Sequence, residues 1–106
     1  MKSFELGEVV LLPFLYSDLK SSKRRPAVVL LDSGDDDVLV AKITTQEYRS
    51  PYDLPLMAWS VAGLRSPSFV RLHKLFAAEK DHVIERIGSV HPTDLVRVQR
   101  IFRSMI

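Results

Sequence analysis

The feature that most constrains the fold is a pair of apolar runs separated by a short polar segment. Residues 27–31 and 38–43 are the two runs, and residues 32–37 between them contain one glycine and four aspartates. Continuous apolar runs of this length, bounded by turn residues, indicate buried strands. Gly and Asp favour turns, because Gly tolerates positive φ and Asp bonds its own backbone. The sequence therefore predicts an antiparallel hairpin.

The two ends of this hairpin hold a first candidate site. Arg25 and Pro26 enter the first strand, and Thr44, Thr45 and Gln46 leave the second. Because the strands are antiparallel, we expect Arg25 and Thr44 at the same end of the sheet. The proline also disfavours a helical backbone at Arg25, which places its guanidinium on an extended chain. A guanidinium beside hydroxyls suits a phosphate group, although strand propensity alone would also explain the threonines.

Length and composition limit the class of protein. The chain has 106 residues, which predicts one domain spanning 1–106, and a chain of this size buries about two-thirds of its unfolded surface. There is no cysteine, so disulfides and thiolate metal sites are excluded. No apolar run approaches the ~20 residues of a membrane span, and the first residues lack the apolar core of a signal peptide. We expect a cytoplasmic soluble protein. A net charge of +2 does not by itself indicate nucleic acid.

A strand is predicted over residues 7–14, ending at Pro13 or lying at an edge there, since proline cannot donate to a ladder. A loop over residues 15–25 then carries four cations in its last six residues. It is either a binding surface or a solvated loop with a basic bias. The four cations are Lys20, Lys23, Arg24 and Arg25.

The middle of the chain has weaker signals. Residues 56–62 can form two helical turns, with Gly63 as a left-handed cap. Residues 68–76 alternate between apolar and polar side chains, but their register is ambiguous. The remaining elements are an extended loop or short edge strand at 47–55, a turn or single helical turn at 77–81, and a strand at 83–90.

The clearest element is a helix that begins at His91-Pro92, with Asp94 in its first turn. Five apolar residues at helical spacing form its buried stripe. A basic row on the other side is either a solvated face or a partner surface. We therefore expect an α+β, mainly β fold: a small, strongly bent barrel with a short helix, covered by the terminal helix. The stripe is Leu95, Val98, Ile101, Phe102 and Met105, and the row is Arg97, Arg100 and Arg103.

An ordered set of short motifs adds a resemblance. Gly-Glu-Val-Val-Leu at 7–11, Arg-Pro-Ala-Val-Val at 25–29 and Ile-Thr-Thr-Gln at 43–46 resemble the family of PemK/MazF-like toxins. The likeness runs from about residue 6 to 100. It implies an SH3-like barrel, a homodimer and an endoribonuclease that cuts single-stranded RNA at short sequences without metal or other cofactor. It also implies an antitoxin peptide that blocks the RNA site. The further matches are Trp59, 62–64, 67–68, 70–72, 74–75 and 87–88.

The resemblance assigns roles to individual residues. Arg25 matches the family's catalytic arginine; because a free guanidinium is a poor base, we interpret it as a transition-state clamp and proton donor. Thr44 matches the threonine that hydrogen-bonds the phosphate. The residues expected to bind RNA are Lys20, Lys23, Arg24, Thr45, Gln46 and Arg71.

One position departs from the family pattern. Relatives often carry Asp two residues after the arginine that aligns with Arg71, and this chain has His73. Residues two apart in a strand share a face, and histidine titrates near neutrality. His73 is therefore either a general base or an ordinary strand histidine. No metal is expected at residues 35–37, because three adjacent carboxylates do not face one point. Two classes of function stay open: a nuclease toxin, or a binding module that kept the barrel and lost cleavage.

Overall fold

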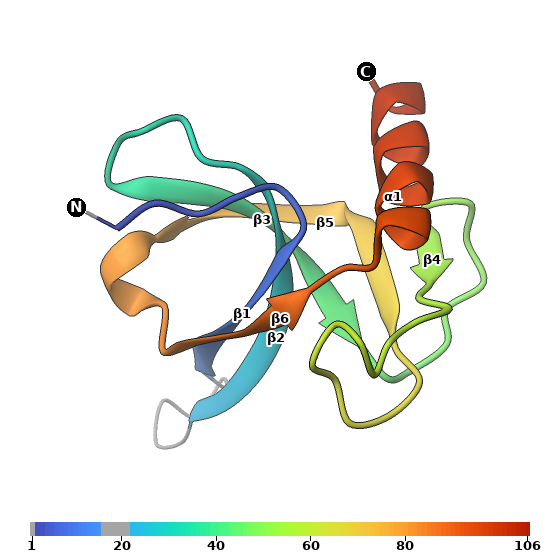
Figure 1. Ribbon diagram of the computed structural model, residues 1–106, viewed down its shortest axis with the longest axis horizontal. Coiled ribbons are helices and arrows are strands. Elements are labelled where there is room, and N and C mark those ends of the chain that lie inside the picture. Colours follow the sequence, from blue (N-terminus) through green and yellow to red (C-terminus); the bar gives the residue numbers. More distant parts are fainter. Residues whose placement is uncertain (1, 16–21) are drawn as a thin grey trace.

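The structure is a computed structural model that describes residues 2–15 and 22–106. Among these residues the strands form one sheet in the order β4-β5-β3-β2-β1-β6, and the one α-helix follows the last strand (Figure 1). The elements are β1 (Glu8–Leu15), β2 (Ser22–Leu31), β3 (Asp37–Thr44), β4 (Asp53–Pro55), β5 (Phe69–Glu79), the 3-10 turn η1 (Lys80–His82), β6 (Glu85–Ser89) and α1 (Pro92–Ser104).

All the strand pairs in this sheet are antiparallel, and the predicted hairpin is β2 and β3. Val28 lies opposite Ala41 and Val29 opposite Val40. The α+β, mainly β class is confirmed. Among the described residues, the end strands of the order, β4 and β6, do not pair with each other. The closed barrel therefore stays a prediction.

The prediction for Pro13 is confirmed by the pairing of β1. This strand pairs with β2 along the stretch from Val9 to Leu15, but its pairing with β6 stops at Leu11. Pro13 therefore lies where β1 is an edge strand. No ladder bond is lost there, which is why proline is tolerated.

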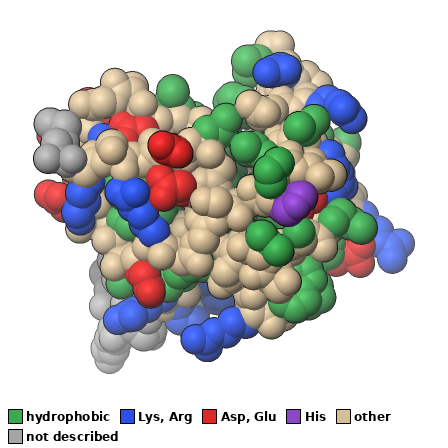
Figure 2. Space-filling view, in the orientation of Figure 1, with side chains coloured by type: hydrophobic (Ala, Val, Ile, Leu, Met, Phe, Trp, Pro, Cys, Tyr) green, Lys and Arg blue, Asp and Glu red, His purple; other side chains and the backbone are tan. Residues whose placement is uncertain are grey.

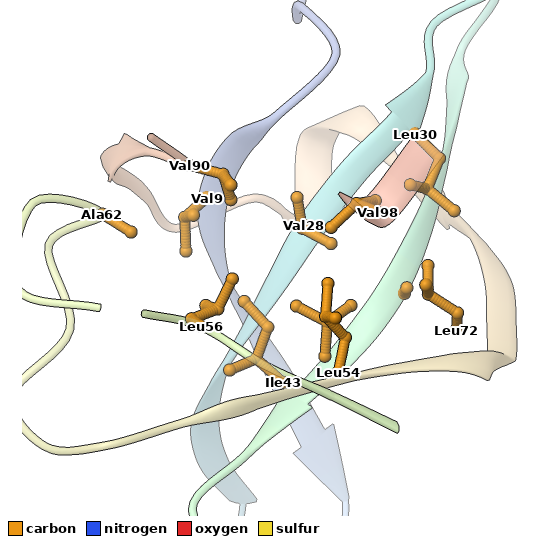
Figure 3. Close-up of a cluster of buried hydrophobic side chains, with 12 residues drawn as sticks. Val9, Val28, Leu30, Ile43, Leu54, Leu56, Ala62, Leu72, Val90 and Val98 are labelled. Carbon is orange, nitrogen blue, oxygen red and sulfur yellow. The ribbon is translucent and has the colours of Figure 1, made fainter. Parts of the chain in front are cut away.

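Each face of the sheet buries its own apolar cluster, as the continuous apolar runs predict. One cluster is covered by α1 and includes Val28, Ile43 and Leu72 (Figure 3). The other includes Ala27, Val29 and Val40. Because successive strand residues point to opposite faces, β2 and β3 contribute to both clusters. In Figure 1, α1 packs over the face near β4 and β5.

The terminal helix follows the sequence prediction closely. Its apolar stripe packs on the first cluster, with Val98 fully buried. The His91 ring caps the helix, since its Nδ1 accepts a hydrogen bond from the Thr93 amide at 3.1 Å. Arg97 is not part of a solvated row, because it donates to the Pro55 carbonyl and to Asp94.

The described part of the chain has no helix long and apolar enough to cross a membrane.

The helix predicted at residues 56–62 is wrong. Residues 57–63 form a series of turns instead. The physical reason lies in α1: the buried Asp94 carboxylate accepts hydrogen bonds from the amides of Met57 and Ala58, at 3.1 and 2.9 Å. These contacts fix the segment to the helix in a conformation set by tertiary structure. The strand predicted at 68–76 is also longer than expected, since β5 continues to Glu79 before η1.

Gly63 lies where the turn segment crosses β6. Its φ is +88°, and a Cβ there would fall far inside contact distance of the Ile87 carbonyl oxygen. Gly34 in the β2–β3 turn has a similar φ of +95°, but a Cβ there would meet nothing within 4 Å. The two glycines share a left-handed backbone and differ only in their surroundings.

We expect Gly34→Ala to cost about 1 kcal/mol of unfolding free energy, from backbone strain alone. Gly63→Ala should cost at least about 3 kcal/mol, because the added methyl group also forces the two backbones apart. Urea denaturation of both variants measures the difference. Equal losses would mean that the crossing of the two segments is not tight.

A buried ion pair ties the hairpin turn to η1. Lys80 Nζ lies 2.8 Å from Asp32 Oδ1, and the two side chains are only 6% and 7% exposed. Asp32 also accepts hydrogen bonds from the amides of Phe4 and Gly34. The hydrogen bond from Lys80, followed by those two amide bonds, lowers the pKa of Asp32 from 3.8 to about 2.

This shift predicts a pH-dependent stability. Because the folded-state pKa lies below the unfolded value, Asp32 stabilises the fold above about pH 4, and this contribution is lost as the pH falls to about 2. Asp32→Asn should be less stable near neutral pH and should lose less stability over that acid range. Thermal unfolding at several pH values tests this, with exposed Asp36→Asn as the control. An acid dependence of wild-type size in Asp32→Asn would contradict the assignment.

Candidate functional site

The sheet face that buries the second cluster becomes polar beyond Ala27 and Val40. Residues of β2 and β3 form part of this polar surface. The last paired residues of these strands are Ala27 and Lys42. By strand alternation, Arg25 shares a face with Ala27, and Thr44 shares a face with Lys42. Continuing the register by two residues sets Arg25 opposite Thr44. The expected approach of this guanidinium and this hydroxyl is therefore supported by the strand register.

Strand β5 adds a second arginine to the same face. Arg71 lies opposite Lys42, and Phe69 lies opposite Thr44. Just beyond Arg71 the register shifts, because Ala41 pairs with Leu75. Residues 72–74 of β5 thus have no partner on β3 and form a bulge. Bulges bend a strand and redirect its side chains, and they are frequent beside active sites.

Arg71 is fixed by three neighbours. Its Nε donates to Asp53 Oδ1 at 2.8 Å, and its guanidinium carbon lies 3.6 Å from the centre of the Tyr48 ring. One terminal nitrogen lies 3.4 Å from His73 Nε2. Stacking and charged hydrogen bonds together give this side chain one orientation.

Asp53, on β4, is the buried anion of the site, and its side chain is 0% exposed. Burial alone would raise the pKa of Asp53, but hydrogen bonds from Ser50 and Arg71 and the charge of Arg71 outweigh burial and lower it. The Ser50 hydroxyl lies 2.5 Å from Asp53 Oδ2. Asp53 is therefore held as a carboxylate that orients Arg71.

His73 lies beside Arg71, as the spacing of the two residues predicts. A guanidinium can only donate, so the contact between them requires that His73 Nε2 accept and that Nδ1 carry the hydrogen. Nδ1 is buried and has no hydrogen-bond partner among the described residues. The unprotonated nitrogen, which a general base needs, is therefore the one that faces Arg71.

The segment after β3 turns back over this face. The Gln46 amide donates to Thr44 Oγ1 at 3.1 Å, and the Tyr48 hydroxyl donates to Gln46 Oε1 at 3.1 Å. A threonine hydroxyl that accepts one bond can still donate its own hydrogen. Thr44 can thus contribute a donor to a bound anion.

The other residues predicted to bind RNA do not all share this face. Lys23 shares the face of Arg25 by alternation, whereas Arg24 points to the opposite face. Thr45 and Gln46 are exposed just after β3. Figure 2 shows Lys and Arg side chains gathered at the edge of the molecule where β2 begins. Lys20 lies outside the described residues.

Sequence reasoning missed Lys42, Tyr48 and Asp53. Lys42 could have been found, because it lies two residues before Thr44 and therefore on its face. Asp53 and Tyr48 come from a segment without periodicity, and only the structure reveals their contacts with Arg71. Among residues 2–15 and 22–106, no three His, Asp or Glu side chains are grouped as metal ligands.

Comparison with known proteins identifies the family. The sequence profile of the PemK-like, MazF-like toxins of type II toxin–antitoxin systems matches residues 5–106. The chain belongs to this family. A search of curated proteins gave no match.

Solved structures of toxins share the fold of this PemK/MazF-like chain. An endoribonuclease in complex with its cognate antitoxin, from a mycobacterial species, aligns with a TM-score of 0.76 at 15% identity, covering 96% of this chain and 93% of that one. A MazE–MazF structure from Deinococcus radiodurans gives 0.76 at 18% identity, over 95% and 93%. The Mycobacterium tuberculosis toxin MazF-mt6 gives 0.70 at 19% identity, over 90% and 93%. At these identities the likeness concerns the fold.

Proposed function

We propose that this toxin is a metal-independent endoribonuclease that cuts single-stranded RNA at short sequences. The observation that carries the proposal is the strand register: Lys42 pairs with both Ala27 and Arg71, and extending the β2–β3 register by two residues sets Arg25 opposite Thr44 on the same face. Cations and a hydroxyl that converge in this way can bind a phosphate and stabilise charge that develops on it. The scaffold is inferred to be a single domain over residues 1–106 with an SH3-like barrel.

The reaction needs no group from outside the chain and its substrate. The ribose 2′-oxygen attacks phosphorus and loses its proton to a base. His73 is the candidate, and it takes this role when its Nε2 exchanges the contact with Arg71 for the 2′-hydroxyl. The bond from phosphorus to the 5′-oxygen breaks, and this oxygen takes a proton, with Arg25 as the candidate donor. The products are a 2′,3′-cyclic phosphate and a free 5′-hydroxyl. Thr44 and Arg71 hold the non-bridging oxygens.

The residues around this centre would bind the rest of the strand. Lys23, Thr45 and Gln46 flank Arg25 and Thr44 on the exposed surface and can contact phosphates and sugars. Lys42, which the sequence did not suggest, adds charge between Arg71 and the β2 strand. Arg24 is assigned at most a peripheral contact, because it alternates to the other face.

We infer a cognate antitoxin peptide and a second copy of the chain as protein partners, and a cytoplasmic location. Apolar side chains gather below α1 in Figure 2. Met57, Val61 and Val96 are among the large apolar side chains that are exposed in the described part of the chain. Exposed apolar patches are typical of surfaces that bind partners. Size measurement of the purified toxin, alone and with the antitoxin, tests the two inferred partners.

Incubation of the purified protein with single-stranded RNA in excess chelator tests the proposed function. We expect fragments that end in 2′,3′-cyclic phosphate, and no cleavage of the all-2′-deoxy strand, which lacks the nucleophile. Cleavage that depends on added metal would contradict the mechanism. RNA that is bound but left intact would instead favour a binding module without cleavage.

A further inference from the structure

A continuous run of planar side chains lies beside the candidate phosphate site. Tyr48 stacks on the Arg71 guanidinium at 3.6 Å, and Arg71 contacts His73. The His73 ring in turn lies 5.6 Å from the Tyr52 ring, tilted by 46°. We refer to these four residues as the aromatic platform. Its two ends, Tyr48 and Tyr52, are 37% and 39% exposed.

Hydrogen bonds hold two members of the platform, Arg71 and Tyr48, in place. Asp53 fixes Arg71 through a 2.8 Å hydrogen bond, and the Ser50 hydroxyl fixes Asp53. The Tyr48 hydroxyl donates to Gln46, which positions its ring. Planar groups that are ordered before binding lose little conformational entropy when a ligand stacks on them.

The position of the platform indicates what it binds. Arg71 lies opposite Lys42, and Gln46, which holds the Tyr48 ring, also bonds Thr44. Exposed rings next to lysine and arginine suit a ligand that combines flat apolar groups with negative charge. Unpaired nucleic acid has this combination, because its bases are free to stack while its phosphates are bound.

We propose that the aromatic platform is a subsite that stacks unpaired bases of the RNA next to the scissile phosphate. The inference rests on the proposed function for the identity of the phosphate site. Stacking on an aromatic face tolerates all four bases. The platform therefore selects for single strands, and any choice of sequence comes from other contacts.

The test is a binding measurement with two probes that cannot be cleaved. One is a mixed-sequence 2′-O-methyl oligonucleotide about ten nucleotides long; the other is an abasic oligomer of the same length and charge. Wild-type protein should bind the first probe more tightly. Tyr48→Ala and Tyr52→Ala should each weaken its binding by about 5- to 100-fold and leave the abasic oligomer unaffected. Tyr48→Phe keeps the ring and should retain most of the affinity.

Equal affinity of the wild-type protein for both probes would overturn the proposal without any variant. Equal weakening of both probes in Tyr48→Leu, which keeps the bulk of the side chain, would also overturn it, because the ring would then serve only to position Arg71. Failure of the nuclease is distinguishable: a protein that prefers the base-bearing probe but leaves ordinary RNA intact retains the subsite and lacks the reaction.

Discussion

Replacing Arg25 by alanine is expected to slow cleavage of single-stranded RNA by about 10²- to 10³-fold or more. In other enzymes, removal of one hydrogen-bond donor that stabilises charge developing in the transition state slows the reaction by about this factor. In the proposed mechanism, Arg25 also donates a proton to the leaving 5′-oxygen. Single-turnover rates with saturating protein separate this loss from weaker RNA binding.

Arg24 is a matched control for Arg25, because it has the same charge one residue earlier and points to the other face. Arg24→Ala should change the rate only a few-fold. Arg25→Lys keeps the charge and loses the fork geometry, so its rate should fall between those of wild type and Arg25→Ala. Similar losses in Arg24→Ala and Arg25→Ala would show that general basicity, and not position, supports cleavage.

Replacing Asp94 by alanine is expected to lower the free energy of unfolding by about 3 kcal/mol or more, a loss as large as that expected for Gly63→Ala. The carboxylate is 1% exposed, and it accepts hydrogen bonds from the amides of Met57 and Ala58 and from Arg97. Removing it leaves two amides without their acceptor and an arginine without its anion. Because small domains have total stabilities of about 5–15 kcal/mol, a large share would be lost.

Urea denaturation measures this loss. Thr93→Ala, an exposed change in the same helical turn, should stay within about 0.5 kcal/mol of wild type. Asp94→Asn keeps one oxygen acceptor and should be intermediate. An Asp94→Ala variant as stable as Thr93→Ala would show that the turn segment does not depend on the helix for its anchor.

The sequence predicts the parts of this fold whose signals are local. Two apolar runs and a turn are enough for the β2–β3 hairpin, and antiparallel pairing then implies that Arg25 lies near Thr44. The periodic stripe and Pro92 predict α1 in the same way. The resemblance to the toxin family, which the sequence profile confirms, supplies the catalytic interpretation.

The rest depends on contacts between distant residues. Residues 57–63 have helical propensity, but Asp94 fixes them as turns from 36 or 37 positions away. Alternation predicts that His73 shares a face with Arg71, but it cannot reveal the register shift that leaves residues 72–74 of β5 unpaired on β3. In the sequence, Asp53 is one polar residue of a segment without periodicity. In the structure it orients Arg71.

The claim on which the nuclease proposal rests is that Arg25 and Thr44 act on one phosphate. A double-mutant cycle on single-turnover cleavage tests this directly, with Arg25→Lys, Thr44→Val and the double variant. We predict that the double variant is slowed far less than the product of the two single effects, because residues that act as a unit are not additive. Arg25→Lys combined with the remote Arg103→Ala serves as the additive control. Effects of Arg25→Lys and Thr44→Val that multiply to within about twofold would contradict a shared phosphate.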